Sequence, residues 1–282
     1  MMMMMAYDSF KPQVWSKSIQ EALAKQMVMG NLVHTEFQGD IKDLGDRVNI
    51  INVGNVIVRD YTRGQSLIID TLTDSLSTLL IDQQKYFAFR VDDLDQAQQH
   101  MNIMEAYTNR AALAIKEVID TRLYGHYTEV ASGNVIGSTT PVALTATNIY
   151  DQITSLAELL DANNVPAEER SLVISPRAKT LLLRSSSFNR ATAGGDELVR
   201  QGRIGYVAGF EVFVSTNIPT LAGGVVPLLA FHKEFVTFAS QVGKTEVVRP
   251  ASEFSSIMRG LYLYGSRVIR PEAGAVLRVT IA

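Results

Sequence analysis

Apolar residues spaced by three and four positions predict two helices in the first half of the chain. The longer run lies between Asp93 and Tyr124, where Asp92 or Asp93 can cap the first turn and Gly125 supplies a C-terminal stop. At 1.5 Å per residue, this spine helix forms a rod of about 45 Å. A shorter amphipathic helix is predicted over residues 12–29. The apolar stripe of the spine helix consists of Leu94, Ala97, Met101, Met104, Thr108, Ala111, Ile115 and Val118.

Between Gly39 and Phe89 the pattern changes to short β-branched runs separated by glycines, which is typical of strands. The segment 59–65 in the middle of this region is polar and carries charges of both signs. It reads as the tip of an extended two-stranded loop. Because isolated hairpins are at best marginally stable, such a loop needs another surface to lie on, and a neighbouring subunit is one candidate. The β-branched runs are Val48–Ile51, Val56–Val58 and Leu79–Ile81.

Glycines near residue 135 mark a boundary, after which helices and strands alternate and predict a second, mixed domain. Thr147 is expected to cap a helix, and Ser175-Pro176 opens another that runs through Leu183. A buried strand is predicted at 172–174, a hairpin at 204–214 and mostly strands from 228 to 281.

Composition narrows the function classes. The 26 basic and 29 acidic side chains give a formal charge of −3, which disfavours a dedicated nucleic-acid binder. The chain has no cysteine, so disulfides, thiolate metal sites and cysteine nucleophiles are excluded. No stretch approaches the roughly 20 apolar residues that cross a bilayer, and the first twenty residues lack a secretion signal. We therefore expect no membrane partner.

Stretches that resemble the motifs of common catalytic sites lack the residue spacing that those motifs require. Gly243-Lys244-Thr245 resembles a phosphate loop, but Phe238 stands where that motif requires a glycine. An excess of basic residues between Arg177 and Arg203 suits an exposed loop or inter-subunit salt bridges better than a phosphate-binding surface. The sequence predicts no enzyme, no cofactor and no metal site. The four histidines, which lack metal-ligand spacing and are expected in surface or capping roles, are His34, His100, His126 and His232.

Several stretches, together with the order of the elements, resemble the major capsid (coat) proteins of tailed bacteriophages. The resemblance covers about residues 10 to 282, essentially the whole chain. The stretches that carry it are Val14-Trp15-Ser16, Gly39-Asp40-Ile41, Gly45–Ile50, Ile81–Phe89, Val91-Asp92-Asp93 and Ala208–Pro219.

The resemblance implies an α+β fold, the Johnson fold shared by tailed-phage and herpesvirus shells. Its expected parts are an N-terminal arm at 1–40, a peripheral domain at 41–139 and 229–270, an axial domain at 140–228, and a C-terminal strand at 271–282 that joins the axial domain. The first part of the peripheral domain holds the extended loop at 54–75 and the spine helix at 93–124.

The resemblance also implies a structural subunit that self-assembles into the pentamers and hexamers of an icosahedral capsid around double-stranded DNA. Further implied partners are a separate scaffolding protein and a portal protein at one vertex, and assembly is expected in the cytoplasm of the host bacterium. Residues 54–75 contain no lysine, so the covalent crosslink of some family members is not expected. The candidate inter-subunit contacts are Trp15, Arg59, Asp60, Tyr61, Arg63, Asp70, Asp74, Arg184 and Arg190.

Two other interpretations stay open at this point. A bacterial nanocompartment shell of the encapsulin kind would keep the fold and enclose enzymes in place of a genome. An α/β enzyme with an unrecognised site in the region 140–230 would be an active monomer or small oligomer. No motif in the sequence supports the enzyme.

Overall fold

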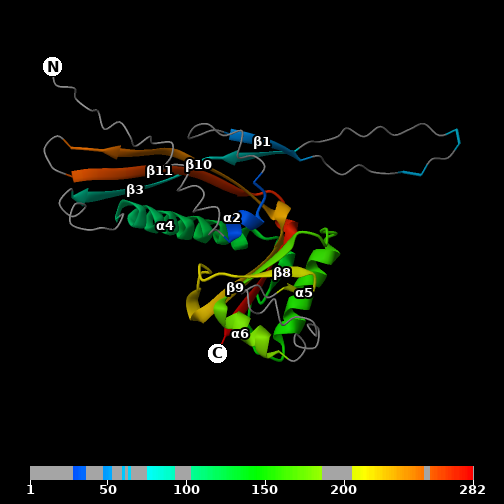
Figure 1. Cartoon of the computed structure of the whole chain (residues 1–282). Coiled ribbons are helices and arrows are strands. Elements are labelled where there is room, and N and C mark those ends of the chain that lie inside the picture. Colours follow the sequence, from blue (N-terminus) through cyan, green and yellow to red (C-terminus); the bar gives the residue numbers. More distant parts are fainter. Residues whose placement is uncertain are drawn as a thin grey trace, which may run out of the picture.

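Two large β-sheets, a two-stranded ribbon and the helices packed on them make up the described part of the chain, which confirms the predicted α+β class (Figure 1). The computed structural model describes residues 28–35, 47–52, 59–60, 63–64, 75–92, 103–185, 205–250 and 255–281.

The first sheet has three long antiparallel strands in the order β10-β11-β3. They are β3 (Gln83–Asp92), β10 (Val236–Val248) and β11 (Ser255–Val268). Asp92 is the last residue of β3, opposite Ser255 of β11, and residues 93–102 lie outside the described residues, so the cap of the spine helix stays a prediction. The alternative cap, Asp93, lies outside the described residues.

Helix α4 (Ile103–Gly125) lies along one face of this sheet and ends at the predicted glycine (Figure 1). The predicted stripe is partly wrong, because Val118 is 40% exposed. The buried positions recur at intervals of four, three, four and four, so the face turned to the sheet has the helical period. These positions are Thr108, Ala112, Ile115, Ile119 and Leu123. The part of the predicted helix before Ile103 lies outside the described residues.

A two-stranded ribbon packs against the other face of the same sheet. Its strands, β1 (Arg47–Asn52) and β2 (Ser75–Leu80), are antiparallel, with Ile50 opposite Ser77. Leu79 and the following Ile81 are fully buried there against Ala239 and Leu263, with Ile50 packed beside them. The predicted runs at 48–51 and 79–81 are therefore confirmed as apolar parts of one ribbon, and the run at 56–58 lies outside the described residues.

Helix α2 (Met29–Leu32) is a short helix on the same core. Met29 and Val33 are buried against α4. The chain then joins the sheet, because His34 N–H donates to the Val236 carbonyl and Phe238 N–H donates to the His34 carbonyl. The rest of the helix predicted over 12–29 lies outside the described residues.

The second sheet has seven strands and mixes parallel with antiparallel pairs. Its central strand pair joins β9 (Val225–His232) to β12 (Gly274–Ile281), both almost wholly buried. Neighbouring strands lie in space in the order 4-12-9-6-8-7, with strand 5 also paired to β12, so β12 lies inside the sheet. The other strands are β4 (Val135–Ile136), β5 (Val142–Leu144), β6 (Arg170–Ile174), β7 (Tyr206–Val207) and β8 (Phe210–Val214).

Two helices pack on this sheet. In α6 (Pro176–Arg184) the Ser175 hydroxyl accepts a hydrogen bond from Ala178 N–H, so the predicted Ser-Pro start is confirmed. Helix α5 (Ile149–Ala162) buries one apolar face against β12. Its N-cap is Asn148, whose Oδ1 accepts from Thr145 N–H, so the expected Thr147 cap is wrong by one position.

A two-residue turn joins β7 and β8 and confirms the predicted hairpin. Ala208 (φ 49°) and Gly209 (φ 85°) both have positive φ, which is the backbone of a type I′ turn. Val207 pairs with Phe210 directly across it.

One apolar core is continuous between the two sheets. Leu123 and Tyr124 of α4 meet Leu229 and Phe231 of β9 there, and Phe235 closes the cluster. Short 3₁₀ turns complete the junction and the loops at His126–Glu129, Ser132–Asn134, Ala222–Gly224, Lys233–Phe235 and Pro271–Ala273. Within the described residues, every helix falls short of the length and apolarity that a membrane span requires.

Candidate functional site

The polar segment that follows β1 is the first candidate surface. Arg59, Asp60, Arg63 and Gly64 are all exposed. Figure 1 shows the short coloured pieces 59–60 and 63–64 well away from both sheets. Two arginines and one aspartate, which lie between β1 and β2 in the sequence, are therefore exposed to solvent. Their role as inter-subunit contacts stays a prediction.

The other predicted contact residues are placed as follows. Arg184 is exposed at the last position of α6, on the second sheet. The remaining five lie outside the described residues, namely Trp15, Tyr61, Asp70, Asp74 and Arg190.

An open groove on the first sheet, on the face opposite α4, is a surface that the sequence reasoning missed. Tyr86 of β3 is 80% exposed and stands opposite Leu261 of β11. Two residues further along β3, Ala88 stands opposite Arg259, which forms an ion pair with Glu246 of β10. These side chains line a hollow of about 450 Å³ with mostly apolar walls.

Alternation along β3 explains why the groove exists. Phe87 and Phe89 pack into the core on the α4 side, while Tyr86 and Ala88 point to the opposite face, because successive side chains of a strand alternate. The run from Tyr86 to Phe89 is thus apolar on both faces. A strand with two apolar faces is typical of a sheet covered on both sides, and this was the signal in the sequence for a covered outer face.

A second, more polar hollow lies where α4 ends beside β3 and β11. Its lining includes Lys85, Arg122, His126, Glu129 and Tyr264. Burial raises the pKa of Tyr264, while the nearby Arg122 charge lowers it. Lys85, Arg122 and Glu129 are its charged lining residues, and all three are exposed, so the hollow carries charges of both signs.

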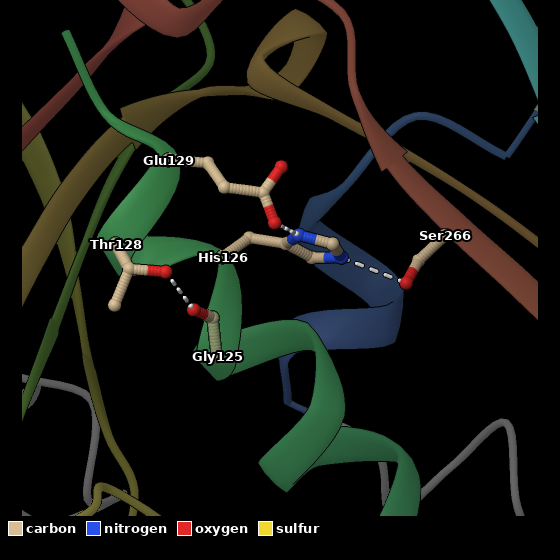
Figure 2. Close-up of polar contacts among 5 residues, drawn as sticks. All are labelled: Gly125, His126, Thr128, Glu129 and Ser266. Atoms are coloured by element: carbon tan, nitrogen blue, oxygen red, sulfur yellow. Dashed lines mark hydrogen bonds and ion pairs between the residues drawn. The ribbon is translucent and has the colours of Figure 1, made fainter.

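His126 is buried at the edge of this hollow, in contrast to the surface or capping role expected from the sequence. Figure 2 shows its ring between two side chains: Nδ1 lies 2.9 Å from Glu129 Oε1 and Nε2 lies 2.8 Å from Ser266 Oγ. The Thr128 hydroxyl donates to the Gly125 carbonyl in the same turn. Since both ring nitrogens are engaged, His126 ties the end of α4 to β11. Within the described part of the chain, no cluster of three or more histidine or acidic side chains is placed to hold a metal ion.

The chain belongs to the phage capsid protein family, whose model matches residues 76–277. It is a major capsid protein, a non-enzymatic subunit of which many copies form a phage shell.

Solved structures agree with this assignment. A chain from Mycobacterium phage Che8 is 30% identical with a TM-score of 0.73, over 89% of this chain and 91% of that one. A chain from the capsid of cyanophage P-SCSP1u is 20% identical with a TM-score of 0.72, over 91% and 88%. A virus-like particle from Pyrococcus furiosus shares the fold at 13% identity and a TM-score of 0.56, over 94% and 98%. Among curated proteins, no sequence matches this chain. The expected tailed-phage capsid fold is thus confirmed.

Proposed function

We propose that the subunit closes into pentamers and hexamers by laying the projecting segment around 59–64 into the outer groove of a neighbouring copy. The observation that carries this proposal is that one chain presents both an exposed polar excursion and an open groove that its own described residues leave uncovered. The two surfaces are different parts of the molecule. Contacts between two different patches generate rings when the rotation closes, and icosahedral shells are built from such rings.

The chemistry of the two surfaces supports this pairing. The groove has apolar walls at Tyr86 and Leu261 and an ion pair, Arg259 with Glu246, at one side. The segment brings Arg59, Asp60 and Arg63, charges of both signs with one basic side chain in excess. A neighbour's segment can cover the apolar walls and extend the ion pair into a network, and burial of apolar surface supplies the main driving force for association.

The two sheets suggest the two domains of a capsid subunit. We assign the three-stranded sheet with α4 to the peripheral domain, and the seven-stranded sheet with α5 and α6 to the axial domain around the five-fold and six-fold axes. The strands β4 (135–136) and β12 (274–281) then belong to the axial side. The shell encloses double-stranded DNA through non-specific contacts. A separate scaffolding protein and a portal protein take part, and assembly occurs in the cytoplasm of the host bacterium.

The absence of cysteine from the chain makes the pairing directly testable. A double variant, Asp60→Cys with Ala88→Cys, is expected to form disulfides between subunits once shells assemble, giving a ladder of linked chains on a non-reducing gel. Asp60→Cys with Ala162→Cys is the matched control, because Ala162 is exposed at the end of α5 on the other sheet. Assembled shells in which the Ala88 pair links no better than the Ala162 pair would refute the pairing.

A nanocompartment shell is the second candidate, and the similarity to the Pyrococcus furiosus virus-like particle is the observation that favours it. That similarity is weaker than the similarity to the phage capsids, so the phage shell is preferred. The contents of particles isolated from an infected host separate the two roles. Double-stranded DNA supports the phage capsid, and a protein cargo without nucleic acid supports the compartment.

A further inference from the structure

Two short 3₁₀ turns carry the chain from one sheet to the other. The first, η5 (Lys233–Phe235), connects the last residue of β9 to the first residue of β10. The second, η6 (Pro271–Ala273), lies between β11 and β12. The two turns contact each other, and an ion pair of 2.9 Å between Glu234 Oε2 and Arg270 Nη1 joins the two crossings. The placement of the first sheet relative to the second therefore depends on these crossings.

His232, the last residue of β9, caps the first of these turns. Its side chain is 6% exposed, and its Nδ1 accepts a hydrogen bond of 3.3 Å from Glu234 N–H, which agrees with the capping role expected from the sequence. An accepting Nδ1 requires the neutral imidazole with its proton on Nε2. A protonated imidazole carries hydrogens on both nitrogens and cannot accept. The cap of η5 therefore exists only while His232 is neutral.

Charged groups of both signs surround this imidazole. Arg170 stands opposite it in the pairing of β6 with β9, next to Glu169, which forms an ion pair of 3.3 Å with Lys233. Burial is the largest effect on the ring and lowers its pKa, the charges of Arg170 and Arg270 lower it further, and those of Glu169 and Glu234 oppose this. Because each of the two carboxylates is also paired with a cation, burial prevails and the neutral ring is the form present at pH 7.

We propose that His232 is a proton-sensitive latch on the crossing from β9 to β10, and that proton uptake removes the cap of η5 and loosens the link between the two sheets. A ring released from its buried position regains the ordinary pKa of 6.5, so it binds a proton more readily than the ring in the closed latch. Acid therefore favours the open form. The contribution of His232 to the closed form is complete above pH 6.5 and is lost as the pH falls below that value.

Hydrogen–deuterium exchange of the full-length, unassembled subunit tests the latch. In the wild type, the amides of residues 233–236 are expected to lose protection about tenfold between pH 7.5 and pH 4.5, after correction for intrinsic exchange. The amides of residues 228–231, inside β9, are the internal control and should stay protected, because they lie within the buried sheet. An equal loss at both places would be acid unfolding and would overturn the latch.

Three variants separate the cap from the proton. In His232→Asn, the asparagine Oδ1 stands where the imidazole Nδ1 stood and accepts a hydrogen bond without titrating, so high protection is expected at both pH values. His232→Ala removes the acceptor and should show low protection at both. His126→Asn is the matched control, because it makes the same change at another buried histidine, which contacts Glu129 and Ser266, and it should keep the wild-type pH dependence at 233–236.

An NMR titration of the wild type keeps the test decisive if a variant does not fold. The ring signals of His232 and the amide signal of Glu234 are expected to shift with one shared midpoint, below that of an unperturbed histidine. Protection at 233–236 that acid leaves unchanged, an acid-induced loss that persists in His232→Asn, or different midpoints for the two signals would each overturn the latch. Since the subunits are unassembled, this result is independent of the ring pairing proposed above.

Discussion

The Tyr124 hydroxyl, near the end of α4, donates a 2.7 Å hydrogen bond to the carbonyl of Pro227 on β9. This bond joins the helix of the first sheet to a central strand of the second. Tyr124 is 1% exposed, and its burial raises the pKa of the phenol strongly, so it stays a neutral donor. The relative placement of the two sheets thus depends on a polar contact within an apolar core.

Tyr124→Phe is predicted to destabilise the subunit by about 1–3 kcal/mol, because it leaves the buried Pro227 carbonyl without this donor while keeping the ring. Urea unfolding of the unassembled subunit measures the change. Tyr206→Phe is the control, since that ring is exposed and should have no effect on stability. Equal midpoints for the two variants would show that the Tyr124 bond does not hold the sheets together.

Two glycines of β11 are predicted to differ in their tolerance of alanine. A Cβ at Gly265 would overlap the Leu80 carbonyl oxygen of β2, and a Cβ at Gly260 would overlap the Phe87 ring. A ring can rotate more easily than a backbone can shift, so Gly265→Ala should cost more than Gly260→Ala, with about 1–3 kcal/mol for the milder change. Thermal unfolding provides the ranking.

Gly133→Ala is the matched control for this pair, because a Cβ there meets nothing within 4 Å. Adding Phe87→Leu to Gly260→Ala should restore part of the loss, as the two sites share one contact. The packing of β2 on β11 would be in doubt if Gly265→Ala were as stable as the Gly133 control.

Alkaline pH is predicted to destabilise the subunit partly through Tyr262. Burial raises the pKa of Tyr262 to about 12, against an opposing hydrogen bond with Ser240. The unfolded chain therefore loses this proton near pH 10 while the folded chain keeps it. The contribution of Tyr262 to the free energy of unfolding is thus complete below pH 10 and is lost as the pH rises toward 12. Between the unfolded and the folded pKa, one such group lowers the free energy of unfolding by about 1.4 kcal/mol per pH unit.

Tyr262→Phe should make the free energy of unfolding fall less steeply with pH, by the contribution of one ionising group. Urea unfolding at several pH values between 9 and 11.5 measures it, with Tyr206→Phe as the exposed control. If Tyr262→Phe left the pH dependence of the unfolding free energy unchanged, the Tyr262 phenol would have the same pKa in the folded and the unfolded chain.

The local patterns of the sequence predicted local structure well. Gly125 ends α4, Ser175-Pro176 begins α6, and the predicted hairpin is present around Ala208-Gly209. In each case the cause lies within a few residues of the feature. The α+β class followed from the resemblance to tailed-phage coat proteins, which the order of the elements helped to carry.

The local patterns did not predict the contacts between distant parts of the chain. Helix α4 has apolar residues on more than one side, including the exposed Leu113 and Val118, so its spacing alone did not identify the buried face. Asp120 is one of several polar positions of the helix in the sequence, and its burial beside Asn217, a residue far along the chain, depends on the tertiary fold. The groove depends on pairing β3 with β11, which are separated by about 170 residues.

Replacing Arg59 and Arg63 together by alanine is predicted to impair shell formation while the subunit stays folded, because both side chains are exposed and away from the sheets. Circular dichroism checks the fold, and sedimentation checks assembly. Arg110→Ala with Arg177→Ala removes the same charge from exposed helical positions and should assemble normally. Normal particles from the Arg59 and Arg63 variant would contradict the role of the projecting segment.

The most direct test of the central claim is electron microscopy of the purified protein together with its sedimentation profile, with and without a co-expressed scaffolding candidate. Closed shells tens of nanometres across, built from rings of this chain, are the predicted result. A compact monomer under every condition would contradict the account.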